Sequence, residues 1–256
     1  MKITLLPSAV SAGAGDRGYY LSSYLINDTI AIDAGGLGLL GGVDVQSRVE
    51  HIFLTHSHID HIASLPIFLE TVFQTRDRCV TLHASTDTLD CLRRDIFNDR
   101  VWPDFIAMSD RGLPFVKVET IQPDQTVEVA GLRLHPHAVD HVVPTLGYLI
   151  EAPGVTVAIP SDTGPTDDFW NTARGFPDLK AVFLEASFPN DMDGLAKISK
   201  HLTPNMFASE LGKLNPHVQF IAVHIKPRFY DTVVSELGHL NLPNLRIGLP
   251  GESYDF

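Results

Sequence analysis

The chain has 256 residues, of which 44% are hydrophobic and 20% charged, a composition typical of a globular protein with a full core. Its formal net charge of −12 opposes binding of long nucleic acid, which depends on Lys and Arg, but a small anionic substrate remains compatible with a cation-bearing site. The chain lacks a run of about 18 apolar residues that would predict a membrane span, and it does not open with a basic segment followed by an apolar one. We therefore expect a cytoplasmic protein, or a periplasmic one if a signal segment has been removed.

The first half of the chain alternates short strand-like runs with helix-like ones. Strands are expected at residues 2–6, 20–26, 29–33, 52–54 and 80–83, with helices beginning near Asp60 and over residues 87–98. A glycine-rich loop is expected after the first strand, up to Gly15. A second one, from Gly35 to Gly42, lacks the G-K-[ST] of a phosphate-binding loop and is interpreted as a surface turn. Residues 102–113 are expected to be irregular.

The second half continues the alternation without a linker, a repeat or a low-complexity segment. Strands are expected at residues 115–118, 126–129, 132–137, 146–151, 155–160, 181–184 and 219–223, and helices at 166–172, 204–214 and 230–240. Strand runs with helices in both halves predict an αβ/βα sandwich, in which two mixed sheets pack face to face with helices outside. Residues 1–256 are accordingly expected to form a single domain.

The segment HSHIDH, residues 56–61, follows a buried strand and contains four side chains of metal-ligand type. His56 and His58 project to the same side of an extended segment, because side chains alternate with a period of two. Asp60 and His61 lie at the turn into the helix and can address a second point in space. Imidazoles and carboxylates suit zinc and related ions, so this segment predicts the start of two adjacent metal sites. A solvated His-rich loop is the alternative.

Later strands end in further residues of the same types. Asp162, in IPSDTGP, stands where a carboxylate could bridge two cations. An Asx turn is plausible in isolation, but the bridge is preferred in view of the other ligand-type residues. His224 ends the apolar run FIAV and so repeats the layout of His56. His201 comes just before Thr203 and Pro204, which are interpreted as the N-cap and first residue of a helix.

HSHIDH resembles the H-x-H-x-D-H signature of the metallo-β-lactamase superfamily. The resemblance implies two divalent metal ions, with zinc as the default and manganese or iron as alternatives. One ion would be held by His56, His58 and His141, the other by Asp60, His61 and His224, with Asp162 between them. His137 competes with His141 for the third position. Asp33, in AIDAG, would lie behind the metals and bond to a ligand or to backbone.

One branch of the superfamily matches more of the chain. SHIDHIASLP, VWPDF, SDTGP, EASFPN and HLTP occur in the order found in class II 3′,5′-cyclic-nucleotide phosphodiesterases, between about residues 29 and 226. The resemblance implies that a metal-bridging hydroxide hydrolyses cyclic AMP or cyclic GMP to the 5′-monophosphate. The chain departs from the branch at Ile59, where Leu is common, and at Ser161, where Gly is usual, and it is shorter than the fungal members.

The same resemblance suggests roles for residues around the metals. Asp60, His201 and Glu185 are expected to be catalytic, with His201 donating a proton or binding phosphate and Glu185 orienting His201 or serving as a structural ion-pair partner. The residues expected to bind substrate are Trp102, Phe188, Asn190 and Thr203. Core packing is the competing interpretation for the aromatic residues.

Other functions remain open from the sequence. A ribonuclease Z-like or general phosphodiesterase would use the same ligands, although no basic arm for tRNA is visible, and a non-catalytic cyclic-nucleotide sensor is a third interpretation. β-Lactamase activity is disfavoured, because those enzymes lack the SFPN and HLTP features. The expected partner is a small cyclic nucleotide rather than long nucleic acid or a membrane, and a homodimer is compatible with the sequence.

Overall fold

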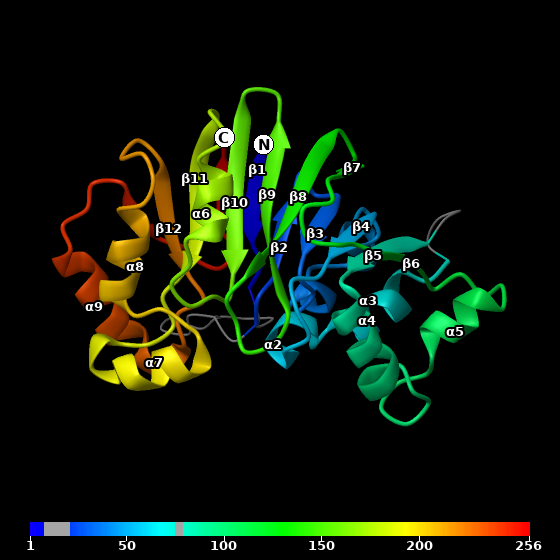
Figure 1. The fold of residues 1–256 in the computed structure, drawn as a ribbon. Coiled ribbons are helices and arrows are strands. Elements are labelled where there is room, and N and C mark those ends of the chain that lie inside the picture. The colour runs from blue at the N-terminus through cyan, green and yellow to red at the C-terminus, as the bar shows by residue number, and fades with distance from the viewer. Residues whose placement is uncertain (8–20, 75–78) are drawn as a thin grey trace. The chain divides into compact units, whose positions relative to one another are not determined.

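The computed structural model describes residues 1–7, 21–74 and 79–256, which divide into two compact units (Figure 1). Unit 1 comprises Met1–Gln122 and Pro250–Asp255, and unit 2 comprises Pro123–Leu249 and Phe256. Each unit is built on one seven-stranded mixed sheet accompanied by helices. This confirms the expectation of two mixed sheets with helices. None of the helices in the described part of the chain has the length and apolarity of a membrane-spanning segment.

The sheet of unit 1 has the strand order β14-β1-β2-β3-β4-β5-β6. The strands are β1 (Lys2–Leu5), β2 (Tyr24–Ile26), β3 (Ile30–Ile32), β4 (His51–Phe53), β5 (Val80–Ala84), β6 (Val116–Thr120) and β14 (Ser253–Asp255). From β3 to β6 the neighbours pair in parallel. The carboxyl ends of β3 and β4 therefore lie at one edge of the sheet, which brings Asp33 close to the segment that begins at Thr55.

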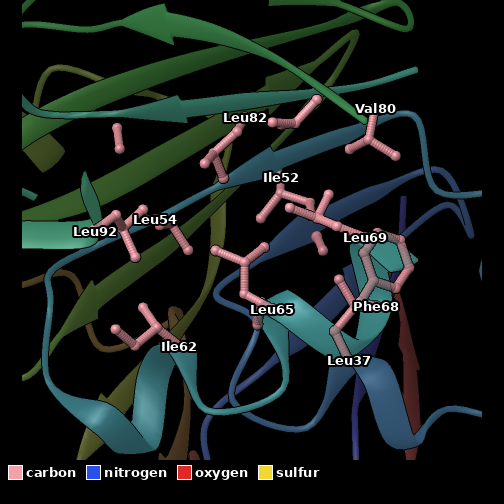
Figure 2. Packing of buried hydrophobic residues seen from close by; sticks show 14 of the residues in the cluster. Leu37, Ile52, Leu54, Ile62, Leu65, Phe68, Leu69, Val80, Leu82 and Leu92 are labelled. Atoms are coloured by element: carbon pink, nitrogen blue, oxygen red, sulfur yellow. The ribbon is translucent and has the colours of Figure 1, made fainter. Parts of the chain in front are cut away.

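Helices pack against this sheet and close the core of unit 1. They are η1 (Leu37–Leu39), α1 (Val43–Gln46), α2 (Ile59–Ile62), α3 (Leu65–Val72), α4 (Thr86–Cys91), the π-helix η2 (Leu92–Ile96) and α5 (Phe105–Asp110). In α3 the buried residues Leu65, Phe68, Leu69 and Val72 recur at helical spacing, so one face of the helix is apolar. Figure 2 shows side chains from the β4 and β5 segments pointing toward those of α3. This packing anchors the segment between β4 and α3, which carries HSHIDH.

The sheet of unit 2 has the order β13-β12-β11-β10-β9-β8-β7. Its strands are β7 (Val127–Val129), β8 (Leu132–Val139), β9 (Thr145–Ala152), β10 (Val155–Ser161), β11 (Leu179–Glu185), β12 (Gln219–Val223) and β13 (Leu245–Ile247). Its helices are α6 (Asp168–Ala173), η3 (Asn190–Met192), α7 (Asp193–Ser199), α8 (Pro204–Leu211), η4 (Pro227–Phe229) and α9 (Tyr230–His239). Because β10, β11 and β12 are parallel, the residues that follow them meet at one edge of this sheet.

Several expectations about elements need correction. The irregular segment expected over residues 102–113 contains α5, whose start is capped by Asp104 Oδ1 accepting from Ala107 N at 2.9 Å. The helix expected over residues 87–98 begins at Thr86 and changes to π-helical geometry at Leu92. The short strands β13 and β14 and the helix α7 are additional. The glycine-rich loop expected up to Gly15 falls largely outside the described residues, as does the expected strand start at residue 20.

Candidate metal centre

In unit 1, HSHIDH begins in the connection from β4 to α2 and ends within α2. His56 Nε2 and His58 Nδ1 lie 3.0 Å apart, as expected for two side chains on the same side of an extended segment. Two nitrogens bound tetrahedrally to one zinc ion at about 2.0–2.1 Å are themselves roughly 3.3–3.4 Å apart. The two rings are therefore within a few tenths of an ångström of the spacing of ligands to one ion. Asp60 and His61 lie in α2, and the rings of His56 and His61 are 4.1 Å apart between centroids.

Asp33 holds this segment from behind. Its carboxylate accepts hydrogen bonds from Thr55 N at 2.8 Å, from Thr55 Oγ1 and from His61 Nδ1 at 2.6 Å. Burial raises the pKa of the Asp33 carboxyl, while the charge of His61 and the hydrogen bonds from His61 and Thr55 offset part of that effect. The backbone of Asp33 has a φ of 61°, in the left-handed region that costs a non-glycine residue about 1–3 kcal/mol.

Backbone contacts also fix the ligand segment. They correct the interpretation of the second glycine-rich loop as a surface turn at the buried Gly35 and Gly36, whereas Gly41 and Gly42 are exposed. Gly35 is buried, and a Cβ added there would lie 2.0 Å from Asp60 O and 2.7 Å from Ser22 O. Ser22 N donates to Asp60 O, and Ala34 N donates to His61 O, both at 2.8 Å. Glycine at this position lets the backbone after β3 lie directly against the backbone of two ligand-type residues.

In unit 2, Asp162, His201 and His224 form a second cluster. Each offers one ligand atom, and these atoms lie within 4.8 Å of one another. Asp162 follows β10 and His224 follows β12, so the parallel pairing described above brings them together. His224 Nε2 lies 3.5 Å from Asp162 Oδ1. Ser161 and His224 have φ values of 64° and 53°, so both strand ends turn through a left-handed residue. A glycine suits the position of Ser161 because glycine adopts this conformation readily. Serine has a narrower range of backbone conformations than glycine there.

His141, and not His137, lies beside this cluster. The His141 ring is 5.1 Å from that of His201 between centroids, and its Nδ1 donates to Lys200 O at 3.1 Å. His137 Nδ1 is instead 2.7 Å from Asp124 Oδ1. Burial lowers the pKa of His141, which favours the neutral ring that a metal requires. The geometry of unit 2 thus favours His141 as the ligand.

Glu185 contacts His201 directly. His201 Nδ1 lies 2.8 Å from Glu185 Oε1, and the Glu185 side chain is almost completely buried. Burial alone would lower the pKa of His201, but the charge of Glu185 and the hydrogen bond to it outweigh burial and raise the pKa above its usual value. His201 therefore retains a proton near neutral pH more readily than an isolated histidine does.

The four residues expected to bind substrate have different surroundings. The Phe188 ring lies 5.6 Å from that of His201, and Asn190 Oδ1 accepts from Asn205 N at 2.9 Å. Thr203 is buried and caps α8, accepting from Met206 N, as the sequence predicts for its hydroxyl. Trp102 packs against the apolar core of unit 1. Of these four residues, only Phe188 makes one of these contacts with a member of the cluster Asp162, His201 and His224.

Two residues that the sequence analysis did not assign a role connect the candidate ligands. Thr55 Oγ1 lies 2.9 Å from Asp33 Oδ2 and 2.9 Å from His56 Nδ1. Ser187 Oγ lies 2.7 Å from Glu185 Oε2 and 3.1 Å from His224 Nδ1. Ser187 stands inside EASFPN and Thr55 directly precedes HSHIDH, but a single hydroxyl in or beside a motif does not indicate which side chain it bonds.

The donor set fits a divalent metal. Four of the candidate histidines place Nδ1 within hydrogen-bond distance of an oxygen, and these are His56, His61, His141 and His224. When Nδ1 donates to that oxygen, the lone pair of the neutral ring is on Nε2. Metal-bound histidines are typically oriented in this way through the ring nitrogen that does not bind the ion. With the carboxylates of Asp60 and Asp162, the two units present nitrogen and oxygen donors that suit zinc, manganese or iron.

Residues 39–225, well over half of the chain, match the family described as the beta-lactamase superfamily domain. The protein belongs to the beta-lactamase superfamily. The fold of this superfamily implies that divalent metal is bound, in agreement with the histidine and aspartate clusters. Among solved structures, this superfamily member is similar to unliganded yeast PDE1, with a TM-score of 0.79 and 19% identity over 98% of both chains. It is also similar to the short form of human tRNase Z, with a TM-score of 0.69 and 15% identity over 100% and 99% of the chains. These likenesses establish the fold.

Curated relatives of this chain include several proteins named as cyclic-nucleotide phosphodiesterases. A probable 3′,5′-cyclic-nucleotide phosphodiesterase of Yersinia pestis is 29% identical over 213 residues, which cover 73% of this chain and 60% of that protein. The 3′,5′-cyclic-nucleotide phosphodiesterase 1 of Saccharomyces cerevisiae is 25% identical over 82% of this chain and 68% of its own. A ribonuclease Z of Kineococcus radiotolerans is 37% identical over 107 residues, but these cover 41% of this chain and 32% of that protein. The match thus spans less than two thirds of the Yersinia pestis relative.

Proposed function

We propose that the protein is a metal-dependent phosphodiesterase that hydrolyses 3′,5′-cyclic nucleotides, cyclic AMP or cyclic GMP, to 5′-nucleoside monophosphates. The observation that carries the proposal is the position of His201. Its ring lies in one cluster with the ligand-type residues Asp162 and His224, and Glu185 holds its Nδ1. A protonated group beside metal ligands can neutralise the alkoxide that departs from phosphorus, which hydrolysis of an alkyl phosphodiester requires.

The proposal assigns the ligand-type residues of both units to a pair of divalent ions, as the resemblance implies. These ligands are His56, His58, Asp60, His61, His141, Asp162 and His224. Zinc is the default ion, and manganese or iron also suit mixed imidazole and carboxylate ligands. When bound, such ions would polarise the phosphoryl oxygens and lower the pKa of water to about 7.

The residues of the chain then supply the proton and the orientation. As the oxygen of water adds to phosphorus and the P–O3′ bond breaks, His201 donates its Nε2 proton to the departing ribose 3′-oxygen, because Nδ1 is already engaged by Glu185. The raised pKa of His201 keeps that proton available near neutral pH. Thr55 and Asp33 hold His56 and His61 in the ring orientation that turns Nε2 toward an ion.

Aromatic and cationic side chains next to His201 suit a nucleotide. Phe188 lies between His201 and Phe229, with ring centroids 5.6 Å and 6.0 Å away, and the Arg228 guanidinium lies 5.5 Å from the centre of the Phe229 ring. Lys226 is close enough for its charge to act against protonation of His201. In a chain with a net charge of −12, these residues offer a base-stacking surface and positive charge for a phosphate.

The test is turnover by purified protein loaded with zinc or manganese. Cyclic AMP, cyclic GMP and bis-p-nitrophenyl phosphate are supplied separately, and the products are separated by chromatography. We expect the 5′-monophosphate rather than the 3′-isomer, and a fall in kcat of about 100-fold or more in His201→Gln, the usual loss when a general acid is removed. If the metal-loaded protein turned over none of the three substrates, the proposal would be wrong.

A ribonuclease Z-like activity is the second candidate, and the 37% identity over 107 residues favours it. The net charge of −12 opposes it, because tRNA binding requires contacts from Lys and Arg to phosphates. Incubation of the same metal-loaded protein with a precursor tRNA distinguishes the two candidates. Cleavage at the 3′ end without hydrolysis of either cyclic nucleotide would replace the first candidate by the second.

A further inference from the structure

Ser187 lies just after β11, between the candidate proton donor and a candidate metal ligand. Its side chain is fully buried. The hydroxyl oxygen lies 2.7 Å from Glu185 Oε2, 3.1 Å from His224 Nδ1 and 3.0 Å from His224 O, and 3.4 Å from His201 Nδ1. A serine hydroxyl has one proton to donate and two lone pairs that accept. Glu185 Oε2 and His224 O, which can only accept, therefore compete for that one proton.

The Ser187 hydroxyl donates its hydrogen bond to the Glu185 carboxylate. A carboxylate is the strongest acceptor among the neighbours, and its contact is the shortest of the four. The lone pairs of Ser187 Oγ then accept from His224 Nδ1–H at 3.1 Å. His224 is thereby kept in the tautomer whose Nε2 carries the lone pair, and that nitrogen is the one 3.5 Å from Asp162 Oδ1.

Glu185 is itself held in place. Its Oε1 accepts from Thr163 N at 2.9 Å, and its Oε2 accepts from Leu202 N at 3.2 Å, in addition to the contact with His201. The backbone groups come from the segment after β10 and the segment before α8, so the carboxylate cannot rotate without losing buried hydrogen bonds. A fixed carboxylate in turn fixes the direction of the Ser187 hydroxyl.

We propose that Ser187 is a positioning residue through which the Glu185 carboxylate, besides orienting His201, fixes the tautomer and ring orientation of His224. One buried carboxylate then orients the proton donor directly and the metal ligand through a hydroxyl. The backbone of His224, with a φ of 53°, is in the left-handed region that residues other than glycine adopt uncommonly. The proposal does not depend on which substrate is hydrolysed.

The test compares Ser187→Ala with a matched control, Thr163→Val. The control also removes a buried hydroxyl next to Glu185, but the Thr163 hydroxyl donates to Gly164 O and its backbone N–H to Glu185 is kept. Long-range ¹H–¹⁵N spectra of the metal-free full chain report which nitrogen of His224 carries the proton. Chelator competition measures zinc affinity. No nucleotide is needed, so a failure here is distinct from a failure of the proposed phosphodiesterase.

We expect His224 to be protonated at Nδ1 in the wild type and in Thr163→Val. In Ser187→Ala we expect the proton to redistribute to Nε2 and zinc affinity to fall about 10–100-fold, the usual loss when a residue that orients a ligand is removed. If Ser187→Ala does not fold, Ser187→Cys, a near-isosteric change to a weaker hydrogen-bonding group, should show the same direction of change. An unchanged His224 tautomer and unchanged zinc affinity in the folded variant would overturn the proposal.

Discussion

Gly35→Ala perturbs the candidate metal centre without touching any ligand side chain. The added Cβ would lie 2.0 Å from Asp60 O, 2.7 Å from Ser22 O and 2.8 Å from Ser22 N. Cβ contacts under 3.0 Å are essentially absent from real structures, so Gly35 or Asp60 must move by about 1 Å, the difference between 3.0 Å and 2.0 Å. All three contacted atoms are backbone, which cannot move aside as a flexible side chain does.

This displacement is large compared with what a metal site tolerates. Bond lengths to a metal have to be kept within about 0.2 Å, and Asp60 and His61 belong to the same short helix as the carbonyl that must move. We therefore expect zinc affinity to fall at least about 10-fold. Overpacking of a buried site costs typically about 1–3 kcal/mol, so the free energy of unfolding should fall by a similar amount.

The control is Gly194→Ala in α7, where an added Cβ meets nothing within 4 Å. Helix propensity there favours alanine by up to about 1 kcal/mol, and zinc affinity should not change. Zinc affinity is measured by chelator competition, and stability by urea unfolding of the metal-free proteins. The reasoning is refuted if Gly35→Ala binds zinc as tightly as Gly194→Ala and unfolds within about 0.5 kcal/mol of the wild type.

Two further perturbations test other parts of the account. Burial, and to a smaller extent the charge of His51, lowers the pKa of His83 from 6.5 to about 4. Between these two pH values His83 is protonated in the unfolded chain but not in the folded one. The free energy of unfolding therefore falls by up to about 3 kcal/mol as the pH is lowered from 6.5 toward 4. His83→Phe should flatten this part of a plot of unfolding free energy against pH, and parallel curves for variant and wild type would contradict the assignment. Lys226→Gln should raise the KM for cyclic AMP about 10-fold, which is the effect of losing a hydrogen bond to a charged group. The control Lys197→Gln, in exposed α7, should leave this KM unchanged. Equal KM values for the two lysine variants would remove Lys226 from the substrate site.

Most elements could be predicted because their signals are local. The apolar spacing of α3 and the Thr203-Pro204 start of α8 are contained in a few consecutive residues. α8 begins where the sequence places it, whereas the single helix expected from near Asp60 is divided into α2 and α3. β14 is different. Its three residues pair with β1, and Ile3 lies opposite Tyr254, so the strand exists only because distant segments meet. A three-residue run carries too little periodicity to be recognised on its own.

The site was predictable in its ligand-type residues but not in the contacts that orient them. HSHIDH has a spacing that few other structures require, so its meaning is visible without coordinates. By contrast, the surface-turn interpretation of Gly35 fails, because glycine is required there by a contact with the backbone of Asp60, which lies 25 positions further along the chain. Ser187 was missed for a similar reason, since its hydroxyl lies 3.1 Å from His224 Nδ1, across 37 positions.

Metal content tests the central claim most directly. The full chain is loaded with zinc, dialysed against zinc-free buffer and analysed for bound metal, beside the variant Asp162→Asn. The account predicts about two ions per wild-type chain, as in two-metal hydrolases, and fewer in Asp162→Asn, where a carboxylate donor is lost. A wild-type protein that retains essentially no divalent ion would contradict it.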